Sequence, residues 1–498
     1  MKIKFLLVAL FLVTLLAACG SNSRDESNDI AERVLTILSC TTHEYVIRDA
    51  AYAMNQAWSD RPYSFRIEVE FYYAVGMRAS GQNRLSPFDG VQSNREEMMA
   101  FGAQLMAGQG PDIFIFDRQE IHNFVNVGIL ADFYTLIDQD PNVNRDDFFG
   151  QALSAFEMQG GLYMLPVSFG FEYIGINANL PQPFLDRFAG LSTVGLKQMI
   201  DIYLDLMTQH EDEFGHMVLG LPRLWQNTTH GLTASEENTL MEIGILLDSI
   251  MGGFIDFDNQ TANLTAPQFI DSLGVLYRLY NNDNSTHGVS SRISHERIWN
   301  LPWDQLFEQM AGERVFTVNS FFHNSLEAFI TPATPHFIYH IPLSDEYGRL
   351  LLNPTTVSAL SPVLASICII NGPNASLAWE FTQHLLYVYA ERITERTIAT
   401  PIKRTHFPSV TTGSLMNSLY VPNVMDRLKH PDEDMRIEIA DNAIARIAIY
   451  NEMPMGLLNN MIPPRLYAEH LDNFLRGFMT ADEFAQTLHN TITLWLME

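Results

Sequence analysis

The chain has 498 residues, of which 47% are hydrophobic and 18% charged, and its formal net charge is −28. This composition is typical of a globular protein that buries a large core and divides into two or three domains, and it excludes a disordered chain. The strong negative charge argues against nucleic acid as a partner and against docking on anionic lipid.

Residues 1–18 have the pattern of a secretory signal peptide. Two lysines precede an apolar run at residues 5–18, which is shorter than the roughly 20 residues of a membrane-spanning helix. The sequence LAAC at residues 16–19 resembles the lipobox of bacterial lipoproteins, and this implies cleavage before Cys19 and a lipid on its sulfur. The alternative is an ordinary signal peptide that happens to contain this cysteine. Residues 19–30 are polar and acidic, so we expect a lipidated flexible tether.

The next part of the chain alternates between strand-like and helix-like patterns. Residues 33–40 are apolar and rich in β-formers, and residues 66–71 alternate apolar with charged side chains, so both predict strands. Ser93 and Glu96 form a capping-box pair that opens a helix, and residues 108–116 end this helix and start a buried strand. The helix between the first two strands is predicted to bury one face, made by Val46, Ala50, Ala53, Met54 and Ala57. The order of elements predicts an α/β sheet with βαβ crossovers.

The second part of the chain is predicted to be more helical. Residues 160–180 contain two strands, and residues 185–315 are mostly helix. The last helix begins at Thr480, where Glu483 completes a capping box, and its inward face carries Phe484, Leu488, Ile492 and Trp495. Further strands are expected at 314–319, 336–342 and 362–370, and a helix at 376–390 with Ala378, Phe381, Leu385 and Val388 on one stripe.

No catalytic or metal-binding motif with the required spacing occurs in the sequence. His336 and His340 lie in a strand-like run, where residues four apart are ~13 Å from each other. The acidic residues at 256–259 lack the glycine and glutamate of a calcium loop. Cys40 and Cys368 both lie in apolar runs, which favours two buried thiols over a disulfide between them. We therefore expect no enzyme activity, no cofactor and no metal.

Several segments, in their order along the chain, resemble the extracellular solute-binding proteins of ABC importers, in the carbohydrate-binding group related to the maltose-binding protein. The matching segments are LTILSCTTHEYVIRDAAYAMNQ, MAGQGPDIFIFD, GGLYMLPVSFGFEYIGINANL, FIDFDNQTANLTAPQFIDSL, AGERVFTVNSFF, ASLAWEFTQHLL and FLRGFMTADEFAQTLHNTITLWLME. The resemblance implies an α/β, two-lobed periplasmic-binding-protein-like fold of type II, with the lobes joined by hinge crossings. The implied N-lobe is 31–170 and 343–402, and the implied C-lobe is 171–342 and 403–498.

Several candidate ligand-binding residues follow strands, because ligands of α/β sheets bind beyond the carboxyl ends of the strands. Glu172 and Tyr173 are candidates because they lie at the first expected crossing between the lobes, and Trp225 and Trp303 because they could supply aromatic faces. Aromatic rings offer flat faces to a sugar, and carboxylates and amides bind its hydroxyls. Trp225, Trp303 and Phe322 could instead be core residues, and Asp117 could simply cap the next helix. The whole candidate set is Thr42, His43, Glu44, Asp117, Arg118, Glu172, Tyr173, Trp225, Trp303, Asn319, Phe321 and Phe322.

The resemblance implies a function as well as a fold. It implies a monomeric protein, anchored by lipid on the extracellular face of the cell membrane, that closes its two lobes on a sugar or oligosaccharide and delivers it to the ABC permease membrane subunits. Two alternatives stay open. One is a surface-anchored polysaccharide hydrolase with two acids ~5–10 Å apart in a cleft. The other is a sensor or adhesion lipoprotein of the same fold.

Overall fold

The computed structural model describes a large part of the chain, with gaps. The described residues are 33–40, 44–59, 65–72, 101–116, 121–171, 173–217, 219, 236–282, 312, 314–318, 337–345, 347–353, 357–358, 361–362, 366–396, 400–401, 453–457, 462 and 466–497. Within these residues, no helix has the length and apolar character needed to cross a membrane.

The first sheet has five strands in the order β2-β1-β3-β15-β4. Its central strand β1 runs parallel to both β2 and β3, and β15 is antiparallel to β3 and β4. The parallel pairs confirm the βαβ crossover that the sequence pattern predicts, and α2 provides the first one. The bounds are β1 (Arg33–Cys40), α2 (Glu44–Trp58), β2 (Phe65–Tyr72), β3 (Ile113–Phe116), β4 (Leu165–Pro166) and β15 (Ser366–Ile369).

The buried face of α2 differs from the predicted one. Val46, Ala50 and Met54 are buried as expected, whereas Ala53 and Ala57 are exposed. Ile47, Ala51 and Trp58 take the remaining core positions. The larger apolar side chains set the rotation of the helix, because they gain more free energy on burial than alanine does.

The predicted buried stripe of the helix at 376–390 agrees with the structure. In α15 (Ala375–Arg396), Ala378, Phe381 and Leu385 are buried, and Val388 packs against the core from a half-buried position. The capping box at residues 93 and 96 lies outside the described residues. Other helical segments here are residues 101–106, α4 (His122–Asn126), α5 (Phe133–Gln139), the 3₁₀ turn η3 (Arg145–Asp147) and α6 (Gly150–Ser154).

The second sheet is mainly antiparallel, in the order β10-β6-β11-β12-β5-β16, with β17 beside β12 and β7 beside β11. The strands β6 and β11 form a long pairing that contains a register shift between Ile338 and Ile341. The bounds are β5 (Ser168–Phe171), β6 (Tyr173–Asn177), β7 (Val194–Gly195), β10 (Phe316–Val318), β11 (Phe337–Ser344), β12 (Leu350–Asn353), β16 (Thr400–Pro401) and β17 (Met455–Leu457). A separate two-stranded pair joins β13 (Val357–Ser358) and β14 (Ser361–Pro362).

Helices from two distant parts of the chain surround the second sheet. The predicted capping box is present in α20, where the Thr480 backbone N–H donates to Glu483 and the Glu483 N–H donates back to the Thr480 hydroxyl. Phe484, Leu488 and Ile492 are fully buried, which confirms the predicted inward face. The bounds are α7 (Gln182–Leu185), α8 (Leu196–Gln209), α9 (Glu211–Phe214), α10 (Glu236–Met251), the 3₁₀ turn η4 (Gly252–Phe254), β8 (Ile255–Asp256), β9 (Thr261–Ala262), α11 (Pro267–Tyr280), α19 (Ala468–Leu475) and α20 (Ala481–Met497).

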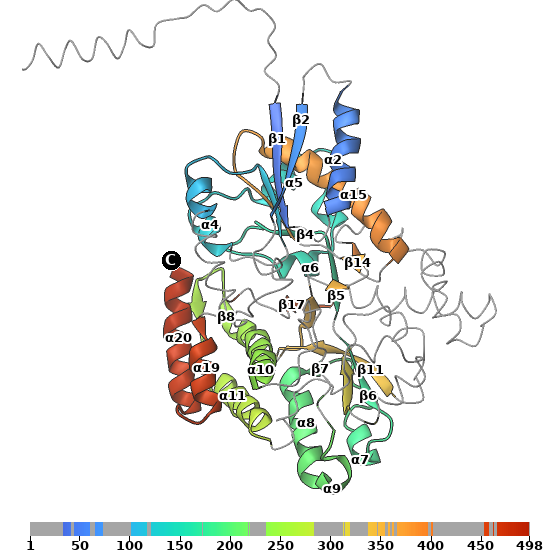
Figure 1. The fold of residues 1–498 in the computed structure, drawn as a ribbon, viewed down its shortest axis with the longest axis vertical. Helices are drawn as coiled ribbons and strands as arrows, with labels where there is room; N and C mark the ends of the chain where they lie inside the picture. Colours follow the sequence, from blue (N-terminus) through green and yellow to red (C-terminus); the bar gives the residue numbers. More distant parts are fainter. Residues whose placement is uncertain are drawn as a thin grey trace, which may run out of the picture.

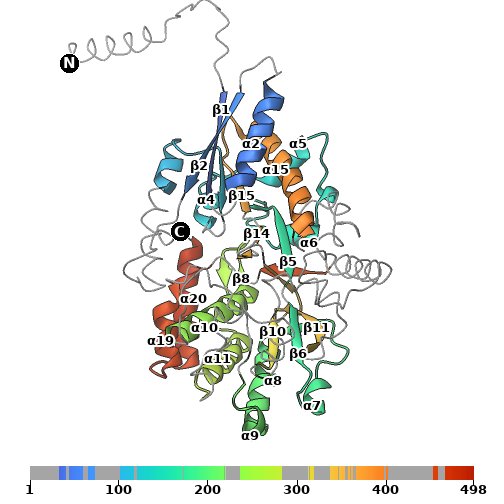
Figure 2. The same ribbon diagram turned by 45° about the vertical axis from the view of Figure 1, so that its right-hand side comes forward.

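The two sheets have separate hydrophobic cores, and we call each core with its elements a lobe. The core of the first lobe is built between residues 35 and 169 and again between 350 and 386. The core of the second lobe is built between residues 174 and 351 and again between 462 and 496. Figures 1 and 2 show the lobes one above the other, with β1, β2, α2 and α15 in the upper lobe and α8, α10, α11 and α20 in the lower one.

The strands between the lobes contribute to both cores. Phe169 of β5 lies in the first core, and Ile174 of the next strand lies in the second. Neighbouring residues of β12 divide in the same way, since Leu350 belongs to the first core and Leu351 to the second. Successive side chains of a strand point to opposite faces, so one strand can supply both cores.

Cys368 is a free, fully buried thiol in β15, so it forms no disulfide with Cys40. Burial raises the pKa of this thiol well above its ordinary value. A buried neutral thiol behaves as a small apolar side chain, in agreement with the sequence-based expectation.

Candidate functional site

In the first lobe, the candidate residues follow two neighbouring parallel strands. Ser39 of β1 pairs with Ile115 of β3, so both strands end at the same edge of the sheet. The loop after β1 carries Thr42 and His43, and Glu44 opens α2. The loop after β3 carries Asp117 and Arg118, and these four loop residues lie outside the described residues. The carboxyl ends of parallel strands are the usual position of a ligand site in an α/β sheet.

In the second lobe, two candidates adjoin in sequence the strands of one antiparallel pair. Val318, the last residue of β10, pairs with Ile174 of β6, next to Tyr173. The end of β10 therefore lies beside the start of β6. Glu172 precedes this start and Asn319 follows the end of β10, but both are outside the described residues. The remaining candidates Trp225, Trp303, Phe321 and Phe322, as well as Cys19, also lie outside the described residues, so their roles stay predictions.

The two lobes touch through side chains that the sequence patterns do not single out as functional. The imidazole Nε2 of His122 donates to the carbonyl oxygen of Trp495 at 3.1 Å, and the two rings lie 4.0 Å apart. His122 is 6% exposed and Trp495 3%. Phe257, in the loop between β8 and β9, packs against both cores. Figures 1 and 2 agree in placing the end of α20 next to α4.

Polar groups border this apolar contact. The Gly160 N–H donates to a carboxylate oxygen of Asp258 at 3.1 Å, and the Gln260 Nε2 donates to Asn126 Oδ1 at 3.0 Å. Gln159 of the first lobe donates to the same Asn126 oxygen. We call this set the interlobe junction: His122, Asn126, Gln159, Gly160, Phe257, Asp258, Gln260 and Trp495. The sequence predicts that Trp495 faces inward, but it gives no signal for a partner 373 residues away.

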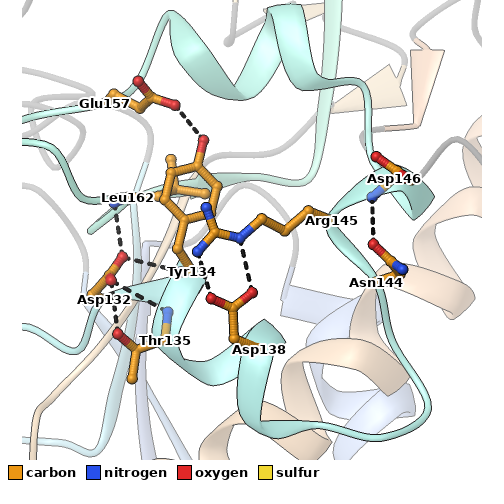
Figure 3. Close-up of polar contacts among 9 residues, drawn as sticks. All are labelled: Asp132, Tyr134, Thr135, Asp138, Asn144, Arg145, Asp146, Glu157 and Leu162. Carbon is orange, nitrogen blue, oxygen red and sulfur yellow. Dashed lines mark hydrogen bonds and ion pairs between the residues drawn. The ribbon is translucent and has the colours of Figure 1, made fainter.

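A network around α5 includes Glu157 and Leu162 (Figure 3), which flank the turn closed by Met158 and Gly161. This turn carries Gln159 and Gly160. On one side of the turn, the Tyr134 hydroxyl donates to Glu157. On the other side, the Leu162 N–H donates to Asp132 Oδ1 at 2.9 Å, and Asp132 also caps α5. Burial, followed by the hydrogen bond to Glu157, raises the pKa of Tyr134, so the phenol remains protonated and able to donate. Both ends of the turn are thereby fixed to one helix.

An arginine covers the outer side of this network. The Arg145 guanidinium lies 4.3 Å from the centre of the Tyr134 ring and pairs with Asp138 at 2.5 Å (Figure 3). The hydrogen bond from Arg145 holds the pKa of Asp138 below its ordinary value. These contacts stabilise α5 and η3. In the described part of the chain, no group of three or more His, Cys, Asp or Glu side chains is arranged to hold a metal ion.

Comparison with solved structures identifies the fold. A candidate oligosaccharide periplasmic-binding protein from Synechococcus sp. MITs9220 superposes with a TM-score of 0.52 at 12% identity, covering 93% of this chain and 99% of that one. The sugar-binding protein MalE from Xanthomonas citri superposes with a TM-score of 0.51 at 12% identity, covering 93% and 97%. No protein-family model and no curated protein matches the sequence. The chain therefore has the two-lobed α/β fold of these two proteins.

Proposed function

We propose that the chain is the lipid-anchored solute-binding component of an ABC importer and that its ligand is a carbohydrate. The observation that carries the proposal is the pair of separate cores joined by shared strands, with candidate loops following the strand ends of each lobe. A ligand that contacts both lobes binds more tightly when they close on it, so binding shifts the equilibrium between open and closed forms. The solved structures that share the fold are binding proteins for oligosaccharides or sugars.

The proposed hinge lies where the chain crosses between the lobes. The proposed N-lobe comprises 31–170 and 343–402, and the proposed C-lobe 171–342 and 403–498, with Leu343 and Leu351 at the boundary packing in the second core. The stretch from β4 to β6 is the first crossing, since β4 pairs in the first sheet and β6 in the second. The stretch from β12 to β15 is another, because these strands also belong to different sheets. Backbone rotation confined to these connections would leave both cores intact.

Calorimetry of the purified chain against a panel of oligosaccharides tests the ligand class. We expect heat release with at least one sugar and an increase in melting temperature at saturating concentration, because a ligand that binds only the folded state stabilises it. Binding of peptides or polyamines with no response to any sugar would overturn the carbohydrate assignment. Release of shortened sugars from a polysaccharide would instead favour a surface-anchored hydrolase.

Substitutions test the proposed ligand contacts. Replacing Asp117 by alanine should weaken sugar binding at least tenfold, because a charged group contributes about 1.5–3 kcal/mol to a hydrogen bond. Trp225→Ala and Phe321→Ala should weaken it through loss of a flat apolar face. The matched control is Phe478→Ala, since this ring is 79% exposed and belongs to none of the candidate loops. Equal affinities of Asp117→Ala and the control would remove Asp117 from the site.

The proposed anchor has a separate test. A Cys19→Ser variant should move from the membrane fraction to the soluble fraction, because it lacks the sulfur that would carry the lipid. Its affinity for sugar should be unchanged, because residues 19–30 are proposed to be only a tether. A variant that stays in the membrane fraction would contradict the lipobox interpretation without affecting the ligand proposal.

A further inference from the structure

Two glutamines in the interlobe junction have an unusual backbone conformation. Gln159 and Gln260 are the only non-glycine residues with positive φ in the described part of the chain, at 53° and 52°. Gln159 lies in the turn that Met158 and Gly161 close, and Gln260 lies in the turn between β8 and β9. The two turns therefore belong to different lobes but share the same left-handed geometry.

Both glutamines donate to one acceptor. The Nε2 atoms of Gln159 and Gln260 each form a hydrogen bond with Asn126 Oδ1, at the last residue of α4. An amide oxygen has two lone pairs, so this atom is fully used by the two donors. Asn126 is half-buried, and three chain segments that are distant in sequence meet at its side chain.

The left-handed conformation has a cost for glutamine that glycine would avoid. A side chain in this region is strained by contact between its Cβ and the backbone, whereas glycine adopts the region freely. Strained residues persist where the surrounding structure requires them, and they gather at functional or switching sites. At both positions the side chain is held by a hydrogen bond to Asn126, which glycine could not form.

The centre of the junction is favourable but incompletely satisfied. His122 and Trp495 bury their rings against each other, and Gly160 and Asp258 bond at the border. The indole Nε1 of Trp495, however, is buried and has no hydrogen-bond partner. A buried donor without a partner offsets part of the free energy gained by the contact. The junction therefore combines a buried ring contact with one unpaired indole donor.

We propose that the interlobe junction is a second joint between the lobes, separate from the strand crossings, which holds the lobes in the present orientation and releases them when they rotate. Rotation would separate Gln260 and Asp258 from Asn126 and Gly160, while the bond from Gln159 to Asn126 would remain inside the first lobe. The junction then sets how the lobes are distributed between orientations before any ligand binds.

Amide hydrogen exchange in the purified full chain tests this joint without any ligand. The variant Asp258→Ala/Gln260→Gly removes both polar contacts from the second lobe, and exchange is read in the first lobe, over α4 and the turn at 157–162. We expect exchange there to accelerate about fivefold or more, since loss of a single hydrogen bond already shifts an equilibrium by about that factor. The reverse variant, Asn126→Ala, should accelerate exchange in the second lobe over residues 255–262.

The matched control lies in the same hairpin. Asp256 accepts hydrogen bonds from the backbone and side chain of Asn259 and from the backbone of Asp258, all within its own turn, and it contacts no residue of the first lobe in the described contacts. Asp256→Ala should therefore alter exchange within the hairpin and leave the first lobe at wild-type rates. Small-angle scattering should show a changed radius of gyration for the double variant and for Asn126→Ala, but not for this control.

Two results of the exchange experiment would contradict the proposed joint. Wild-type exchange across the lobes in both junction variants would show that the junction holds nothing, and so would equal acceleration by Asp256→Ala. Gln260→Gly alone sharpens the distinction, because glycine removes the strain. If it raises the melting temperature and leaves exchange in the first lobe unchanged, Gln260 has no joining role.

The effect on ligand affinity rests on the proposed function. If a sugar prefers one lobe orientation, the junction variants should change its apparent affinity by the same factor as they change the distribution of orientations. If exchange accelerates in the junction variants but the protein binds no sugar, the joint is supported and the carbohydrate ligand is rejected. If the protein binds a sugar but exchange in the junction variants is unchanged, the carbohydrate ligand is supported and the joint is rejected.

Discussion

Aromatic rings pack in the cores of both lobes, but the lobes differ in which elements their carboxylates connect. In the first lobe, carboxylates tie distant elements to each other: Asp112 accepts from the Thr36 N–H and hydroxyl and from Asn374. In the second lobe, helices pack through rings, as where Phe474 stacks on Phe484 at 4.9 Å. Its described ion pairs are local or lie nearer the surface: the buried carboxylate of Asp345 pairs with Arg349 four residues away, and Lys197 pairs with Asp201. Loss of one carboxylate should therefore matter in the first lobe, and loss of one ring in the second.

The largest effect is expected from truncating a ring in the second lobe. Phe484→Ala should lower the free energy of unfolding by about 3–5 kcal/mol, because the ring is fully buried and leaves a cavity. Urea denaturation measures the loss. Leu494→Ala on the same helix is the control, since Leu494 is 63% exposed and its truncation should change stability by less than about 0.5 kcal/mol. Equal losses would show that ring packing does not govern this lobe.

A smaller loss is expected from removing a carboxylate in the first lobe. Asp112→Ala should cost about 2–3 kcal/mol, because it leaves donors of Thr36 and Asn374 without an acceptor in a partly buried place. Asp112→Asn keeps one acceptor oxygen and should lose less. If the alanine variant unfolds at the wild-type urea concentration, the polar ties do not stabilise the lobe.

A second carboxylate of the first lobe should make stability depend on pH. Burial raises the pKa of Asp140, but hydrogen bonds from Asn142, Trp379 and Gln383 outweigh it and hold the pKa below its ordinary value of 3.8. A depressed pKa stabilises the folded state above the ordinary value, and this contribution is lost as pH falls through the folded-state pKa. Asp140→Asn should therefore cost about 1 kcal/mol at pH 7, with a gap that closes under acid conditions. Urea denaturation at neutral and acid pH measures it, and a gap independent of pH would contradict the assignment.

The smallest effect is expected from an ion pair of the second lobe. Lys197 contacts Asp201 at 2.8 Å and Asp271 at 3.0 Å, and the Asp271 side chain is 69% exposed. Lys197→Met should change the free energy of unfolding by less than about 1 kcal/mol, and about 1 M salt should remove the difference. Thermal denaturation at low and high salt checks this. A larger loss that persists in salt would mean that ion pairs, too, hold this lobe.

Elements that depend on local patterns could be predicted from the sequence. The capping box at Thr480 and Glu483 needs only residues three apart, and strand β1 needs only a run of β-formers. The predicted buried face of α2 was partly wrong, because the sequence pattern gave Ala53 and Ala57 the same weight as larger apolar side chains. Helix rotation depends on which residues gain most from burial, and this depends on the sheet that the helix meets.

The candidate site could be predicted only in part. The resemblance places candidates after β1, β3 and β10, and the pairing of these strands brings two of the loops to one edge. The junction could not be predicted, since Gln260 meets Asn126 across 134 residues and no local pattern marks either residue. Left-handed glutamines are also invisible in a sequence, because turn patterns assign such positions to glycine or asparagine.

The division of β12 between two cores has a consequence for unfolding. Leu350 and Leu351 are adjacent residues buried in different cores. Unfolding of either core would disturb the strand β12 and weaken the burial of the leucine that packs in the other core. A chain of this length would ordinarily be expected to lose its parts one by one. Because β12 contributes side chains to both cores, we expect the two lobes to unfold together in one cooperative transition.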